Sequence, residues 1–155
     1  MSTQPSILVV TNSYPNRYKP YAGWYIERHV VFHREAGLNI EVLTTGDSRR
    51  TVLRSIWKYA KLSLRILEAL LFANFDLIHA HWVLPAGLYG LILSRLRHRP
   101  LVVTSHGVSI HAFESRSCVI QYLTRFVLRR ASVVIVVGRQ QRETLLDIVN
   151  LPRGP

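Results

Sequence analysis

The stretch that decides the fold is Leu101-Val102-Val103-Thr104-Ser105-His106-Gly107. Its first five residues are largely apolar and β-branched without alternation, which is typical of a strand buried on both faces of a parallel sheet. Ligands of open parallel α/β sheets lie just beyond the carboxyl ends of the strands. Gly107 lets the backbone turn sharply or approach a ligand there, because it lacks a Cβ atom. The pattern leaves two interpretations of His106: a residue that contacts a polar ligand, or an ordinary histidine in a strand-to-helix loop.

A similar strand precedes this stretch. It runs Asp76-Leu77-Ile78-His79-Ala80-His81 and ends in polar groups. Pro85-Ala86-Gly87 follows, and proline suits the first turn of a helix. A helical pattern from Leu88 to Arg97 then leads to Pro100 and the next strand. The segment is therefore predicted to form one βαβ unit in which both strand ends carry histidines.

The rest of the chain repeats this alternation of strands and helices. Strands are predicted near 7–11, 40–45, 76–80, 101–105 and 132–137, and helices near 24–36, 50–71, 88–97, 115–130 and 139–148. The alternation predicts an open, mainly parallel, Rossmann-like α/β sheet with helices on both faces. The longest uncharged run, Leu77 to Ser94, approaches the length of a membrane-spanning helix. Its histidines, proline and glycines instead indicate a buried strand followed by a buried helix.

Composition places the chain among globular, intracellular proteins. A length of 155 residues suits one domain, and a hydrophobic content of 48% argues against disorder. One cysteine, Cys118, excludes an internal disulfide framework and fits a reducing cytoplasm. The polar segment from Met1 to Ser6 lacks the features of a secretory signal peptide. We therefore expect a cytoplasmic protein.

The charge of the chain indicates an anionic partner. Twenty Lys and Arg residues stand against nine Asp and Glu residues, which gives a formal net charge of +11. Phosphate groups, anionic lipids and nucleic acids would all be attracted, and net charge cannot choose among them. The sequence has no recognised RNA- or DNA-binding motif, so we do not expect nucleic acid as the partner. Tight and strongly salt-dependent binding to nucleic acid would favour that alternative.

The predicted helix at 50–71 has an unusual surface. At 100° per residue its basic side chains fall within an arc of about 80°, and they are Arg50, Arg54, Lys58, Lys61 and Arg65. An adjoining apolar arc of about 100° holds Leu53, Ile56, Trp57, Ala60, Leu64, Leu67 and Leu71. Further apolar residues, among them Leu62 and Ile66, continue beyond it, so the apolar surface exceeds what one sheet requires. Two interpretations remain: a helix at an anionic membrane interface, or a deeply packed helix with a solvated basic edge.

The segment 76–113 resembles the N-terminal domain of family-four glycosyltransferases, which have the GT-B fold. In that family an Asp-h-h-His-x-His strand (h, hydrophobic) precedes a Pro-x-Gly helix, and a His-Gly-x-Asp loop follows the next strand. The matching residues here are Asp76, His79, His81, Pro85, Gly87, His106 and Gly107. Ser109 stands where the family usually has aspartate. The resemblance extends from Ile7 to about Asn150.

The resemblance implies roles for individual residues. His106 would be catalytic and would bind the transferred sugar near the reacting carbon, with Gly107 and Ser109 in the same loop. Gly23 and Trp24, at the start of the first predicted helix, would contact the donor diphosphate or the acceptor. His81 would line the cleft. Backbone N–H groups at a helix N-terminus do attract anions, although a single glycine such as Gly23 is equally consistent with a simple turn.

The implied reaction moves a sugar from a nucleotide-diphosphate sugar to an acceptor hydroxyl on a glycan, polysaccharide or lipid-linked acceptor. It usually retains the anomeric configuration, with the departing phosphate as base and the protein stabilising charge. No cofactor and no metal are expected beyond this co-substrate. His79 and His81 share one face of a strand. A zinc site would need a third or fourth ligand, and no such cluster is evident nearby.

The resemblance also implies that the chain is half of an enzyme. Residues 1–150 would be the N-terminal domain and 151–155 the start of an interdomain linker. In the family a C-terminal donor-binding domain with paired glutamates follows, and here it is missing or supplied elsewhere. We therefore expect the chain to be inactive by itself. The alternative is a non-catalytic half that docks a donor-binding partner chain or an anionic membrane surface, peripherally on the inner face of the membrane.

Overall fold

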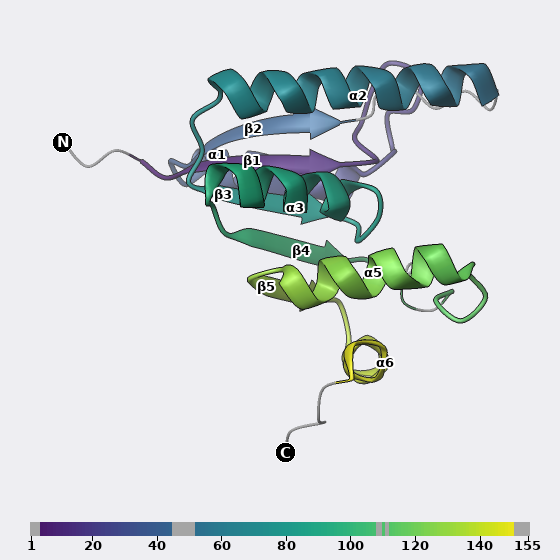
Figure 1. Cartoon of the computed structure of the whole chain (residues 1–155). Helices are drawn as coiled ribbons and strands as arrows, with labels where there is room; N and C mark the ends of the chain where they lie inside the picture. The colour runs from purple at the N-terminus through teal and green to yellow at the C-terminus, as the bar shows by residue number, and fades with distance from the viewer. Residues whose placement is uncertain (1–3, 45–51, 108–109, 111, 151–155) are drawn as a thin grey trace.

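A computed structural model of the chain describes residues 4–44, 52–107, 110 and 112–150, with the side chains of residues 52–59 outside that description. The strands are β1 (Ser6–Thr11), β2 (Asn39–Thr44), β3 (Leu77–His81), β4 (Leu101–Ser105) and β5 (Val133–Val136). The helices are α1 (Trp24–Glu35), α2 (Val52–Phe72), α3 (Ala86–Arg97), α5 (Cys118–Arg130) and α6 (Arg139–Val149). Strands and helices alternate along the chain as the sequence predicts (Figure 1).

The strands form one open sheet in the order β2-β1-β3-β4-β5, and all four neighbouring pairs are parallel. The predicted Rossmann-like α/β class is confirmed. In the register of the sheet, Thr11 pairs with His81 and His81 pairs with Thr104. The carboxyl ends of the three central strands therefore lie side by side, where ligands of such sheets bind.

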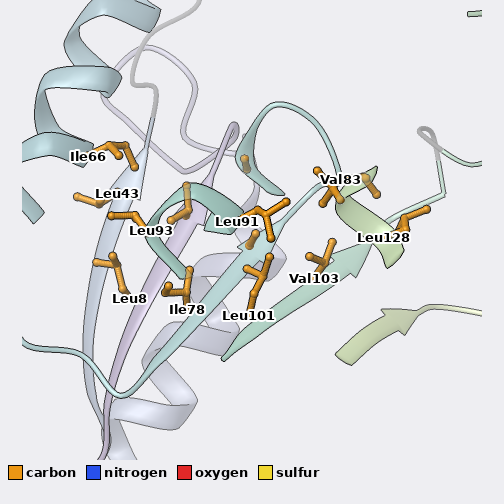
Figure 2. Packing of buried hydrophobic residues seen from close by; sticks show 14 of the residues in the cluster. Leu8, Leu43, Ile66, Ile78, Val83, Leu91, Leu93, Leu101, Val103 and Leu128 are labelled. Carbon is orange, nitrogen blue, oxygen red and sulfur yellow. The ribbon is translucent and has the colours of Figure 1, made fainter. Parts of the chain in front are cut away.

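Helices cover both faces of the sheet. Alternate residues of β1 point to opposite faces: Leu8 and Val10 join the larger core cluster, and Val9 joins the smaller one. The larger core lies under α2, α3 and α5, and Figure 2 shows part of it, including Leu43, Leu91 and Val103. The smaller core lies under α1, on the opposite face from α2, α3 and α5. The sheet is therefore buried on both faces at β1, as a parallel sheet requires.

The long uncharged run at 77–94 forms strand β3 and most of helix α3, as predicted. Ile78 and Ala80 are fully buried in the larger core, and Leu93 joins them from α3. Within the described ranges, no helix combines the length and the apolarity that crossing a bilayer would need.

Several arginine side chains hydrogen-bond the backbone carbonyl oxygens at the C-terminal ends of helices. Two guanidinium nitrogens of Arg97 donate to the carbonyl oxygens of Leu70 and Ala73, at 2.7 and 2.8 Å, where α2 ends. Arg129 donates to the carbonyl of Val149 at 2.8 Å, where α6 ends. Cations are favoured at helix C-termini because the last carbonyls lack partners within the helix. Part of the positive charge of the chain therefore stabilises the fold itself.

Helix α2 carries an apolar face that the fold does not bury. Leu62 and Ile66 pack in the larger core, with 1% and 6% of their surface exposed. The leucines that face away from the sheet are 50 to 65% exposed, and they are Leu64, Leu67 and Leu71. The predicted excess of apolar surface is confirmed for this described part of the helix. Lys61 and Arg65 are exposed beside it, whereas the side chains of Arg50, Arg54 and Lys58 lie outside the described residues.

Candidate functional site

The site forms where β3 and β4 end. The backbone N–H of Trp82 donates to the carbonyl of Thr104 at 2.9 Å, which extends the pairing of the strands one residue past β3. His106 follows directly after β4, and Gly107 then turns the chain with a φ of 100°. A φ in this range is rare for residues with a Cβ atom. The turn needs glycine at this position, and it leaves the His106 ring at the carboxyl edge of the sheet.

Three rings surround the imidazole of His106. The ring centroid of Tyr25 lies 4.8 Å away, that of Trp82 lies 5.2 Å away, and that of His81 lies 5.3 Å away and nearly parallel at 12°. Tyr25 comes from the first turn of α1, His81 from β3 and Trp82 from the segment after β3. Three separate parts of the chain therefore hold this ring in one orientation.

Hydrogen bonds join the histidines to one another and to β4. Nδ1 of His81 lies 3.1 Å from Nε2 of His106, and Nε2 of His79 lies 2.8 Å from Oγ1 of Thr104. Between two neutral imidazoles, one ring donates and the other accepts, so the bond couples the tautomers of His81 and His106. If Nε2 of His106 is the donor in this bond, its Nδ1 can accept a hydrogen bond from a ligand. If Nε2 is the acceptor, Nδ1 carries the proton and can donate one.

These histidines are held in the neutral form. Burial, followed by the neighbouring charges of His79, His106 and His29, lowers the pKa of His81 to about 3. Burial likewise lowers the pKa of His79 to about 4, with smaller contributions from His29, His33 and His106. The pKa of His106 is also lowered, first by burial and then by His29. At neutral pH the cluster therefore offers hydrogen-bonding groups rather than cations.

Gly23 has a structural reason to be glycine. It caps the N-terminus of α1 with a φ of 67°, and its carbonyl accepts a hydrogen bond from the N–H of Ile26 at 2.9 Å. A Cβ atom at this position would lie 2.3 Å from the carbonyl oxygen of Ser13. The turn interpretation is therefore sufficient to explain this glycine, and its contact with a diphosphate remains a prediction. Trp24, which follows it, is 52% exposed and lies edge-on to Tyr25.

The structure brings most of the predicted site residues together. His106, His81 and Gly107 meet at the ends of β3 and β4, and Tyr25 connects them to Gly23 and Trp24 at the start of α1. Ser109 lies outside the described residues. Among the residues that the structure does describe, no group of three or more His, Cys, Asp or Glu side chains is placed to hold a metal ion.

Sequence reasoning missed two members of the site. Tyr25 could have been found from the sequence. It lies two positions after Gly23, which was predicted to bind a ligand, and so falls on the first turn of the same helix. Trp82 follows His81 directly and has a φ of 88°, which is uncommon for a residue other than glycine. Its carbonyl accepts a hydrogen bond from the N–H of Gly87 at 3.0 Å, which helps to hold this strained backbone in place.

An open parallel sheet with histidine and aromatic rings gathered at its carboxyl edge defines a Rossmann-like α/β domain. The chain belongs to the glycosyl transferase 4-like domain family, whose profile matches residues 7–155. The match covers the whole βαβ unit at 77–105 and the loop that carries His106, in agreement with the resemblance noted in the sequence. A search of curated proteins returns no match to this chain.

Proposed function

We propose that this domain is the acceptor-side half of a glycosyltransferase that moves a sugar from a nucleotide-diphosphate sugar to an acceptor hydroxyl. Membership of the glycosyl transferase 4-like family supports the transferase class. The observation that carries the proposal is the placement of His106. Its imidazole stands at the carboxyl end of β4, enclosed by the rings of Tyr25, His81 and Trp82. A neutral, fixed imidazole is suited to hydrogen-bonding a sugar at the point of reaction.

In the proposed reaction the bond between the anomeric carbon and the diphosphate oxygen breaks, and a bond from that carbon to the acceptor oxygen forms. The departing phosphate takes the proton of the acceptor hydroxyl, and configuration is retained. His106 hydrogen-bonds the transferred sugar, and the N-terminus of α1 at Gly23 and Trp24 faces the diphosphate, where helix N–H groups favour anions. The protein acts through position and charge stabilisation, without a cofactor or a metal.

The proposal divides the work between two domains, which gives a direct test. Residues 1–155 alone should transfer no sugar, whereas the same domain together with a donor-binding α/β domain that carries paired glutamates should do so. The donor-binding domain is to be sought in the full gene product and among co-purifying chains. Release of nucleoside diphosphate and the mass gained by the acceptor are the measurements. Transfer by residues 1–155 alone would contradict this division, and no transfer by the pair would contradict the assignment as a transferase.

A second function, docking on an anionic membrane surface through α2, is favoured by the apolar face of that helix. Leu64, Leu67 and Leu71 are exposed on α2, and the exposed charged residues beside them are Lys61, Arg65 and Glu68, two basic and one acidic. A helix with exposed leucines bordered by basic side chains suits the interface of an anionic bilayer. Peripheral attachment at the inner face of the membrane would bring the site close to lipid-linked acceptors.

Leu67→Glu should weaken binding to vesicles of phosphatidylcholine and phosphatidylglycerol by about tenfold, because it removes half-exposed apolar surface from the contact and adds a repelled charge. Sedimentation with vesicles measures the bound fraction. The matched control is Phe32→Glu, since Phe32 is 68% exposed on α1, which lies on the opposite face of the sheet. Equal binding of Leu67→Glu and the unmodified chain would rule out α2 as the docking element.

A further inference from the structure

Helices α3 and α5 lie on the face of the sheet that also carries α2 (Figure 1). Side chains from these two helices line a groove. It consists of two adjoining hollows of about 490 and 290 Å³, which share Leu88. The α3–α5 groove, as we call it, is defined by Leu88, Ile92, Leu96, Ile120, Leu123 and Phe126. The larger hollow begins at Leu84 and Pro85, shortly after the site residue Trp82, whereas the smaller hollow lies toward the C-terminal end of α3, at Arg95 and Leu96.

The groove exposes side chains that a folded domain normally covers. Ile92 and Leu96 of α3 are 44% and 57% exposed, and Ile120 of α5 is 39% exposed. Single exposed apolar residues are common, but a contiguous set that lines a hollow marks an interaction surface. Helix α2, on the same face of the sheet, also carries exposed leucines, so exposed apolar side chains occur on three helices of this face.

The charged side chains that line the two hollows are all arginines. Arg95 and Arg130 line the smaller hollow, and Arg116 lines the larger one. The guanidinium of Arg130 lies 4.0 Å over the ring of Phe126, which fixes it at the wall of the groove. None of the described residues that line either hollow is acidic. An occupant with an apolar body and a negatively charged head fits both properties.

We propose that the α3–α5 groove takes an acyl chain of an anionic phospholipid at the bilayer surface, with Arg95 and Arg130 binding the headgroup phosphate. This inference rests on the proposed attachment of α2, which brings the same face to the membrane. A lipid surface fits better than a partner helix, because exposed apolar side chains occur on three helices of this face. A second copy of the chain fits less well, since a symmetric contact would set the same arginines against one another.

The first experiment asks whether the groove contacts acyl chains. Leu96→Cys is made in a Cys118→Ser background, because Cys118 is the sole cysteine and is itself exposed on α5. The new thiol is labelled with bimane and mixed with phosphatidylglycerol vesicles that carry bromine atoms on their acyl chains. The label at 96 should shift to the blue and be quenched, whereas a label at Phe32→Cys should be unchanged. Vesicle binding without quenching at 96 would overturn the proposal.

The second experiment asks whether the groove adds affinity. Leu96→Glu should weaken binding to phosphatidylglycerol vesicles about tenfold, because the carboxylate is repelled by the lipid and cannot enter an apolar site. Phe32→Glu is again the control, and circular dichroism verifies that both variants are folded. Unchanged binding of Leu96→Glu alongside a loss in Leu67→Glu would overturn the groove proposal and leave the α2 proposal standing.

Two further outcomes separate this inference from its alternatives. If the chain is dimeric in solution and Leu96→Glu makes it monomeric, the groove is an interface between copies and the lipid proposal is overturned. Sugar transfer to a soluble acceptor by the two-domain enzyme should be unchanged in Leu96→Glu, because Leu96 lies in the last turn of α3 and the first turn of that helix is the one that adjoins Trp82. A failure of lipid binding therefore stays distinct from a failure of the transferase proposal.

Discussion

Replacement of His106 by alanine is expected to lower kcat for sugar transfer by about 10²- to 10³-fold, the usual cost of removing one group that stabilises charge in a transition state. The ring is packed among Tyr25, His81 and Trp82 at the carboxyl end of β4, so its position does not depend on the ligand. It is only half-buried, and its loss should leave the fold intact. The measurement is the initial rate at saturating donor, made on the domain together with its donor-binding half.

Two companion variants sharpen this prediction. His106→Gln keeps a hydrogen-bonding group and should retain more activity than His106→Ala, since the neutral ring is proposed to act through a hydrogen bond. His98→Asn is the matched control, because His98 is an exposed histidine with a left-handed backbone that asparagine tolerates. A rate for His106→Ala within about twofold of the unmodified enzyme, well inside the range expected for a bystander, would remove His106 from the mechanism.

The strands could be predicted closely because each is a short apolar run between turn residues. The predicted strand at 101–105 is β4 itself, whereas the strand predicted at 76–80 lies one residue later, at Leu77–His81. The sequence places His81 at the polar end of this strand. It is buried nonetheless, at 3% exposure, because its Nδ1 is hydrogen-bonded to His106. The loop after β4 contributes this partner, and a local sequence pattern cannot show it, so the burial of His81 was not predictable.

The helix at 50–71 shows the same limit on local patterns. Periodicity identified a helix with two adjoining apolar arcs, and the structure begins it at Val52. Periodicity alone could not say which arc meets the sheet. The packing places Leu62 and Ile66 against the core and leaves Leu64 and Leu67 outside it. The choice depends on the position of α2 relative to β1 and β2, which is a property of the assembled sheet.

The sequence predicted the site residues at the ends of the strands, but not the aromatic residues Tyr25 and Trp82 that surround His106. His106, Gly107 and His81 follow from the rule that parallel sheets bind ligands at their carboxyl edge. The contact of Tyr25 with His106 depends on strand order, because β1 must lie beside β3 for α1 to reach the loop after β4. The positive φ of Trp82 could not be predicted from the sequence, because a positive φ is usual for glycine and this position holds tryptophan.

The histidine cluster also predicts how the domain responds to acid. The pKa of His79 is lowered from 6.5 to about 4, chiefly by burial and then by the charges of His29, His33 and His106. The unfolded chain therefore takes up a proton as the pH falls below 6.5, whereas the folded chain stays neutral until about pH 4. The contribution of His79 to the free energy of unfolding is complete above pH 6.5 and is lost as the pH falls across this window. Complete protonation of this one residue in the unfolded state costs the fold about 3 kcal/mol.

His79→Gln should flatten this dependence, because glutamine does not titrate and can still hydrogen-bond Oγ1 of Thr104. Urea unfolding at pH 7 and pH 4.5 gives the loss of unfolding free energy between the two values. We expect this loss to be smaller in His79→Gln than in the unmodified domain by about 2 kcal/mol, a substantial fraction of a typical domain stability.

His98→Asn serves as the control for the acid response, because it removes an exposed histidine that lies outside the cluster. Its loss of stability between the two pH values should match that of the unmodified domain. A second histidine in the cluster, His81, has its pKa lowered to about 3, so part of the acid sensitivity should persist in His79→Gln. If His79→Gln and the unmodified domain lose equal stability on acidification, His79 is not held neutral by burial. The neutral hydrogen-bonded cluster that supports His106 would then be the wrong description of this site.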